Sequence, residues 1–201
     1  MNPLAAALAL FPGRVEEIDR TLFLFINDRL RHAWLDPLMT FVTRKWNFLI
    51  PLTFVAWYLL VMGGRRGRAI VTAAILLVVF TDAGATALRS HFQRVRPCMA
   101  VPGMHLLVGC SDSFSFPSNH ATNAFALAAF LAVFYRKLTI PLLATAALVA
   151  YSRIYVGVHY PADVVAGACF GGSVGLACGA ISWWWLHRGG KTTDVSEQTT
   201  D

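Results

Sequence analysis

Five apolar stretches, each nearly long enough to cross a lipid bilayer, dominate this chain of 201 residues. They cover residues 46–62, 69–88, 120–135, 138–155 and 162–186. A transmembrane helix needs about 20 mostly apolar residues to span roughly 30 Å of hydrocarbon. A soluble protein of this size cannot bury five such segments. We therefore expect an all-α fold, a polytopic transmembrane bundle of five to six spans.

The composition agrees with a membrane protein, because 56% of the residues are hydrophobic and only 14% are charged. Trp183, Trp184 and Trp185 end the last stretch, where an aromatic belt is typical. The net charge of +6 does not indicate nucleic-acid binding, because much of the basic charge lies in short loops or near candidate site residues. The bilayer is the expected partner, and no obligatory protein partner is evident.

Residues 1–45 precede the first stretch and show a different pattern. Between residues 15 and 30, apolar side chains recur at helical spacing, which predicts an amphipathic helix lying in the membrane interface. Segment 33–42 continues this interfacial region or extends the first span, so a sixth crossing stays open. Run 3–11 is too short to span and lacks the basic region of a signal peptide. The apolar residues are Ile18, Leu22, Phe25, Ile26 and Leu30, and the polar ones are Glu16, Glu17, Asp19, Asn27 and Asp28.

Basic residues in short loops predict the orientation, because such loops stay in the cytoplasm. Segments 89–119 and 154–161 then face outward, toward the periplasm of a bacterial inner membrane. The arginines there, including Arg94, oppose the rule, and an anionic ligand would explain them. Residues 46–187 form the expected catalytic bundle, and 188–201 a disordered cytoplasmic tail. The cytoplasmic basic residues are Arg65, Arg66, Arg68, Arg136, Lys137, Arg188 and Lys191.

Three polar clusters border the outward segments, each where an apolar run meets polar sequence. They could converge on one site although they lie far apart in the chain. The clusters are Arg89-x6-Arg96-Pro97, Pro117-Ser118-Asn119-His120 and Ser152-Arg153-x5-His159-x3-Asp163.

The third cluster contains a candidate nucleophile. Pro161 favours the first position of a helix, which places Asp163 in the first turn. Its carboxylate can accept the N–H of the His159 ring, fix the tautomer and make the other nitrogen more nucleophilic. The alternative is an interfacial histidine beside an aspartate that only caps the helix.

The other two clusters offer an acid and an anion site. Ser118 and His120 stand at a second apparent helix start, where backbone N–H groups bind anions and His120 can protonate a leaving oxygen. A simple helix cap is the alternative for this motif. The guanidinium groups of Arg89, Arg96 and Arg153 suit phosphate oxygens, although arginines also extend to lipid headgroups.

One further polar residue and the four cysteines lie outside the three clusters. Asp82 lies inside the second span, where it pairs with an arginine or a polar neighbour, and we assign it no catalytic role. Cys98 and Cys110 can form a disulfide in an oxidising periplasm or remain two unpaired residues. Cys169 and Cys178 are expected to pack in the last span, near glycines that allow close helix approach. These glycines are Gly167, Gly171, Gly172 and Gly175.

No spacing of His, Cys and acidic residues matches a zinc site, and Asp112 is the only carboxylate near the site in the long outer loop. The sequence also lacks a glycine-rich nucleotide loop. We therefore expect chemistry without a metal ion or cofactor.

Together, the three clusters resemble the signature of the type 2 phosphatidic acid phosphatase superfamily: K-x6-R-P, P-S-G-H and S-R-x5-H-x3-D. The resemblance covers residues 82–172 and implies that His159 attacks phosphorus while Asp163 orients it. It also implies that His120 protonates the leaving lipid oxygen. Arg96, Ser118, the Asn119 backbone and Arg153 would hold the phosphoryl oxygens, and water would discharge the phosphohistidine.

Two positions depart from the family pattern. Arg89 replaces the lysine, which keeps the charge and changes its reach. Asn119 replaces a glycine, which narrows the pocket or adds a donor, and a change of specificity is expected more than a loss of activity.

The expected function is a metal-independent lipid phosphatase. Undecaprenyl pyrophosphate is the favoured substrate, because the chain is small and its site faces outward like those of bacterial enzymes that recycle this lipid. Phosphatidylglycerophosphate, phosphatidic acid and lipid A 1-phosphate remain alternatives. A non-catalytic module that binds or transports lipid phosphates is the alternative of another class.

Overall fold

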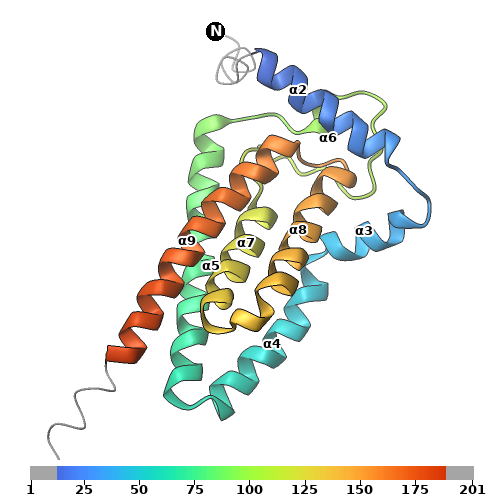
Figure 1. Ribbon diagram of the computed structural model, residues 1–201. Coiled ribbons are helices and arrows are strands. Elements are labelled where there is room, and N and C mark those ends of the chain that lie inside the picture. Colours follow the sequence, from blue (N-terminus) through green and yellow to red (C-terminus); the bar gives the residue numbers. More distant parts are fainter. Residues whose placement is uncertain (1–12, 189–201) are drawn as a thin grey trace, which may run out of the picture.

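The computed structural model describes residues 13–188, and these form helices without a strand (Figure 1). The predicted all-α bundle is confirmed. The apolar stretches form α4 (Lys45–Met62), α5 (Gly64–Phe92), α7 (Asn119–Phe134), α8 (Thr139–Tyr155) and α9 (Pro161–Arg188). The shorter elements are α2 (Gly13–Leu24), the π-helix η1 (Phe25–Arg29), α3 (Leu35–Thr43), α6 (Pro97–Ala100) and the 3-10 helix η2 (Arg136–Leu138).

Helix length limits the number of crossings. Within the described residues, four segments are long and apolar enough to span: Lys45–Met62, Gly64–Ala100, Arg136–Tyr155 and Pro161–Arg188. Helix α7 is apolar and has 16 residues, which makes it about 24 Å long. The bundle therefore has five membrane spans if α7 is counted as one, and four if it is not. Helix α3 has nine residues, about 14 Å, which is too short for a sixth crossing.

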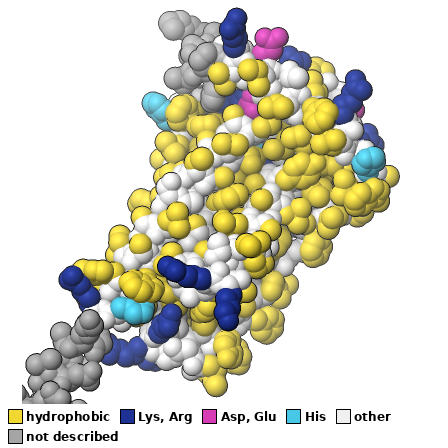
Figure 2. Space-filling model, viewed as in Figure 1, with side chains coloured by type: hydrophobic (Ala, Val, Ile, Leu, Met, Phe, Trp, Pro, Cys, Tyr) yellow, Lys and Arg dark blue, Asp and Glu magenta, His cyan; other side chains and the backbone are white. Residues whose placement is uncertain are grey.

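The outer surface of the bundle is apolar. Helix α4 contains no buried residue, and its Trp46, Ile50, Phe54 and Trp57 are all exposed. In Figure 2, hydrophobic side chains cover the flank of the molecule, and charged side chains gather toward its two ends. A continuous apolar flank of this extent faces lipid. The chain is a multi-pass membrane protein.

Helix α7 lies at the centre of the bundle, in contact with α5, α8 and α9. Its closest approach is to α9, along glycines spaced four residues apart. A Cβ atom on Gly171 or Gly175 would overlap a backbone carbonyl of α7, and one on Gly167 would lie 2.7 Å from the backbone carbonyl oxygen of Ser118. Gly179 also faces α7, whereas Gly172 was wrongly assigned to this contact, since no described atom outside α9 lies within 4 Å of its Cβ position.

The cysteines of the last span differ in their surroundings. Cys178 packs against the apolar cluster of Ile70, Leu77, Ala126 and Phe130, as expected for a packing residue. Cys169 is exposed on the outer side of α9, so it does not share that role. In the outer loop, Cys98 and Cys110 are joined by a disulfide, with their Cα atoms 6.1 Å apart.

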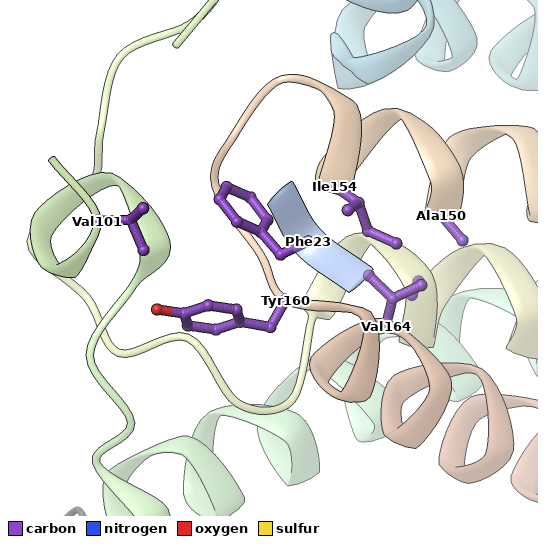
Figure 3. Packing of buried hydrophobic residues seen from close by; sticks show 7 residues of the cluster. Phe23, Val101, Ala150, Ile154, Tyr160 and Val164 are labelled. Carbon is purple, nitrogen blue, oxygen red and sulfur yellow. The ribbon is translucent and has the colours of Figure 1, made fainter. Parts of the chain in front are cut away.

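Helix α2 and η1 are helical, as the spacing predicts, but they turn a mixed face toward the protein. Asp19, Phe23 and Asn27 are buried, whereas Ile18 is 60% exposed. Phe23 joins Val101, Ala150, Ile154, Tyr160 and Val164 in one apolar cluster (Figure 3). The exposed apolar face suits an interfacial helix, and its position in the membrane stays a prediction.

The connections lie at two opposite ends of the bundle (Figure 1). The α4–α5 and α7–α8 turns lie at one end, and α2, α6 and the α8–α9 turn lie at the other. This is the division that the basic loops predict, although the side of the membrane that each end faces stays a prediction. The apolar run 3–11 and the polar tail beyond residue 188 lie outside the described residues.

Candidate active site

The three sequence motifs meet at the end of the bundle that carries α2 and α6. Arg89 belongs to the last turn of α5, and Arg153 to the last turn of α8. The Ser118 N–H, at the start of α7, donates to the Asp163 carbonyl at 3.0 Å, which ties the second motif to the third. His159 lies between α8 and α9. The fold therefore brings together helix ends that are distant in the sequence.

His159 is buried between a guanidinium group and a carboxylate. Its side chain contacts Arg96, whose Nη1 lies 3.2 Å from Nε2, and its Nδ1 lies 3.5 Å from Asp163 Oδ2. A guanidinium group only donates, so Nε2 must be the acceptor and Nδ1 carries the proton. The Nδ1 separation is long for a hydrogen bond and acts as an electrostatic contact. Nε2 is therefore the nitrogen with a reactive lone pair.

Burial also sets the charge of this ring. Removal from water lowers the pKa of His159 to about 4, although the Asp163 carboxylate acts in the opposite direction. The imidazole is therefore neutral at pH 7. A neutral ring is what nucleophilic attack requires.

Asp163 is fully buried and is held by three donors. Arg94 Nη1 donates to Oδ1 at 2.7 Å, and the Ser115 hydroxyl donates to Oδ2. The Tyr160 N–H donates to Oδ2 at 2.8 Å, so Asp163 also caps the first turn of α9. The two interpretations of Asp163, as a histidine partner and as a helix cap, are thus compatible.

Arg94 plays a different part from the one that its loop position suggests. Its guanidinium bridges two buried carboxylates, because Nη2 also contacts Asp19 Oδ2 at 2.6 Å. It also stacks 4.2 Å above the Tyr160 ring. The other oxygen of Asp19 accepts the Ala162 N–H at 2.8 Å. Arg94 therefore links Asp163 to Asp19 of α2, and no anionic ligand is needed to explain its charge.

Several buried donors near His159 make no hydrogen bond to residues 13–188: Arg89 Nε and Nη2, Ser118 Oγ and Arg153 Nε. Ser118 begins α7 without a side-chain cap bond, so the helix-cap alternative is wrong for its hydroxyl. Buried donors are almost always paired in proteins. Because the charges of Arg89, Arg96 and Arg153 also repel one another, this group fits a bound anion.

His120 occupies the first turn of α7, within electrostatic range of Arg153, His159 and Arg96. The first N–H groups of a helix have no intrahelical acceptor, so the start of α7 adds further donors. The structure places His120 on the same side as the anion-binding donors, where it can give a proton to a departing oxygen.

Asp82 pairs with polar neighbours on another helix. Its Oδ1 accepts from Asn119 Nδ2 at 2.8 Å and from Asn123 Nδ2 at 3.1 Å. Arg89 lies within electrostatic range of the same carboxylate. The hydrogen bonds join α5 to α7 beside the site.

Sequence patterns missed some residues of this site, including Asp19, Ser115 and Thr43. Thr43 holds the Arg153 Nη1 through its hydroxyl, and it is buried at the end of α3. None of these residues belongs to a motif. The sequence offered two separate signals, the carboxylate of Asp19 on the N-terminal amphipathic helix and the outer-loop Arg94, which opposes the basic-loop rule. Nothing in the sequence shows that these two side chains meet.

The arrangement defines a class of protein. A buried neutral imidazole beside the guanidinium groups of Arg96 and Arg153, with Arg89 next to Arg96, suits phosphoryl transfer, which needs a nucleophile and charge stabilisation. Its position at one end of a lipid-facing bundle makes the protein a membrane phosphatase.

Comparison with known proteins identifies the family. A model of the PAP2 superfamily matches residues 69–188, and the chain belongs to this superfamily of lipid phosphatases. It is 35% identical to a lipid A 4'-phosphatase of Bacteroides thetaiotaomicron over 79% of this chain and 74% of that protein. It is 30% identical to the undecaprenyl-diphosphatase BcrC of Bacillus subtilis over 65% of this chain and 66% of that one.

The fold agrees with this assignment. A solved PAP2-type phosphatidylglycerolphosphate phosphatase from Bacillus subtilis superposes with a TM-score of 0.70 and 25% identity, over 92% of each chain. The similarity thus includes most of the helical layout as well as the motif region.

Proposed function

We propose that the protein removes the terminal phosphate from a lipid phosphate or pyrophosphate through a phosphohistidine intermediate, without a metal ion. The reaction takes place at the periplasmic face of a bacterial inner membrane. The observation that carries the proposal is the neutral His159 ring, with its Nε2 3.2 Å from Arg96 Nη1, beside buried donors that lack partners within residues 13–188.

In the first step, the lone pair of His159 Nε2 attacks phosphorus, and the bond from phosphorus to the lipid oxygen breaks. The negative charge of the bound phosphate favours the protonated form of His120, and this imidazolium gives its proton to the oxygen as it leaves. The guanidinium groups of Arg89, Arg96 and Arg153 and the Ser118 hydroxyl stabilise the charge on the phosphoryl oxygens. Asp163 stabilises the positive charge that develops on the imidazole.

In the second step, water attacks the phosphohistidine and the bond between nitrogen and phosphorus breaks. His120, now neutral, accepts the proton from water, and inorganic phosphate leaves. Both histidines return to their starting protonation states, so the cycle needs no other reactant.

The substrate class follows from the position of the site at the end of a lipid-facing bundle. Its members include undecaprenyl pyrophosphate, phosphatidylglycerophosphate, phosphatidic acid and lipid A. The names of the relatives support the class and not one member, since they include phosphatases of three different lipids.

Phosphate release by the purified protein tests the proposal. We expect release in detergent containing EDTA from at least one of these four lipids, and at least a thousandfold slower release, about 4 kcal/mol in barrier, for His159→Ala. Asp112→Asn, in the exposed outer loop, is the matched control. Lipid binding without release would instead favour the non-catalytic binding or transport module.

A further inference from the structure

Asn119 replaces the glycine of the family pattern, and its amide lies between α7 and α5. The Nδ2 group donates to Asp82 Oδ1 at 2.8 Å. Because an ionised carboxylate can only accept hydrogen bonds, the NH2 end of the amide must face Asp82. The network therefore fixes the amide orientation and turns Oδ1 away from Asp82.

This Oδ1 atom is buried and makes no hydrogen bond within the described part of the chain. Asn123, one turn later on α7, provides the comparison: its Nδ2 also donates to Asp82, and its Oδ1 lies 2.9 Å from the Thr81 hydroxyl. Both ends of the Asn123 amide are thus used, and only one end of Asn119. A buried acceptor without a donor is costly, so Asn119 Oδ1 suits a donor from a ligand.

The position of this acceptor indicates which part of a ligand it meets. Asp82 precedes Arg89 by seven residues on α5, about 10 Å along the helix and toward the middle of the bilayer. Because the apolar chains of a lipid lie in the hydrocarbon region, a lipid whose phosphate contacted Arg89 would extend its leaving group in the same direction. Asn119 Oδ1 and the exposed Asp82 carboxylate offer only acceptors there. They suit hydroxyl groups and repel a second phosphate.

We propose that Asn119, oriented by Asp82, selects lipid phosphates whose leaving group carries a free hydroxyl next to the phosphate ester. A glycerol or a sugar has this chemistry, and a pyrophosphate lacks it. The inference rests on the proposed function and places hydroxyl-bearing lipids ahead of undecaprenyl pyrophosphate, which the sequence favoured. Asp82 is a positioning residue in this account, because it acts through Asn119.

A pair of substrates that differ by one hydroxyl tests the proposal. 1-Acyl-glycerol 3-phosphate carries the hydroxyl beside the ester, and 1-acyl-propanediol 3-phosphate lacks only this group. For the natural chain we expect kcat/KM to be about fivefold higher for the glycerol compound, the effect of one hydrogen bond. An acylated glucosamine phosphate with a free hydroxyl next to the phosphate ester tests whether a sugar leaving group is also preferred. Undecaprenyl pyrophosphate should be the poorest substrate.

Three variants separate selection from folding. Asn119→Gly removes the acceptor and restores the family residue, so the ratio should fall to about one. Asp82→Asn frees the Asn119 amide to rotate and removes the negative charge, so the ratio should fall and the relative rate with the pyrophosphate should rise. Asn123→Ala, the control, breaks the neighbouring hydrogen bonds and should keep the natural ratio.

The outcomes distinguish the inference from the function. A ratio near one in the natural chain, or a ratio unchanged by Asn119→Gly, overturns the inference while His159-dependent release upholds the function. Equal loss of the ratio in Asn123→Ala also overturns it, because the effect would then be structural. Absence of release from every lipid overturns the function and the inference together.

Discussion

At the scale of single residues, His159 depends on groups that it does not touch. Asp163 holds the proton-bearing side of the ring, and Arg94 holds Asp163. Asp19 then holds Arg94 from a different helix. Asp19 and Asp163 share the positive charge of the Arg94 guanidinium. The loss of the Asp19 carboxylate would therefore change the position of Arg94 and the electrostatic environment of Asp163.

Asp19→Asn tests this chain of contacts. The amide keeps the size but loses the charge opposite Arg94, so we expect kcat to fall about tenfold, ~1.4 kcal/mol in barrier, with little change in KM. Steady-state phosphate release measures both constants. Glu17→Gln, an exposed residue on the same helix, is the control. An unchanged kcat for Asp19→Asn would show that the contact with Arg94 does not position Asp163.

The low pKa of His159 predicts an unusual pH dependence. Burial lowers this pKa to about 4, so the ring stays neutral as the pH falls through 6.5, where an ordinary histidine becomes half protonated. Nitrogen NMR of histidine-labelled protein should show His159 titrating near pH 4, with the signal assigned by its loss in His159→Asn. A midpoint near pH 6.5 would contradict the desolvated environment described above.

At the scale of elements, the contact between α7 and α9 sets the distance between the two histidines. His120 lies in the first turn of α7, and His159 lies just before α9. The glycine seam, formed by Gly167, Gly171, Gly175 and Gly179 of α9 against α7, therefore fixes the position of His120 relative to His159. The sequence predicted close approach but could not select the face, since Gly171 and Gly172 are adjacent and point in different directions. The missed Gly179 continues the four-residue spacing from Gly175.

Gly171→Ala should separate these helices, because the added Cβ would overlap the Thr122 carbonyl. Overpacking of this kind costs about 1–3 kcal/mol, so we expect a lower unfolding temperature in detergent and slower phosphate release. Intrinsic tryptophan fluorescence follows the unfolding. Gly172→Ala adds the same atom where no described neighbour lies within 4 Å and should change neither property. Equal behaviour of the two variants would rule out a seam at Gly171.

The N-terminal helix shows where sequence reasoning stopped. Its periodicity predicts an amphipathic helix, and the helix is present as α2 and η1. Periodicity does not reveal that Asp19 and Asn27 face the protein, because that depends on partners far along the chain. Asn27, for example, donates to the backbone oxygens of His105 and Tyr155 at 2.8 Å. Motif spacing identified the candidate reacting residues but not these supporting contacts.

At the scale of the whole molecule, the apolar flank and the two polar ends give the bundle a defined orientation across a bilayer. The site lies at the end with α2 and α6, and the arginine-rich α4–α5 turn lies at the other (Figure 1). Hydropathy predicted the spans because every backbone group in lipid must be paired within its own helix. Hydropathy does not predict that the three motifs meet, because their meeting depends on how α7 packs against α5, α8 and α9.

Cysteine labelling tests the orientation. In a chain whose native cysteines are replaced by serine, we expect Asp112→Cys to react with a membrane-impermeant maleimide in intact cells. Arg66→Cys should react only after the cells are opened, because its turn is predicted to be cytoplasmic. The reverse pattern would place the site on the cytoplasmic side.

The central claim is that His159 becomes phosphorylated, and trapping the intermediate tests it most directly. The purified protein is mixed with a lipid carrying a labelled terminal phosphate, quenched in alkali within milliseconds to seconds, and digested for mass spectrometry. The account predicts an acid-labile, alkali-stable phosphate on the peptide that contains His159, and no label in His159→Ala. Turnover without any labelled histidine, or a label that persists in His159→Ala, would contradict it.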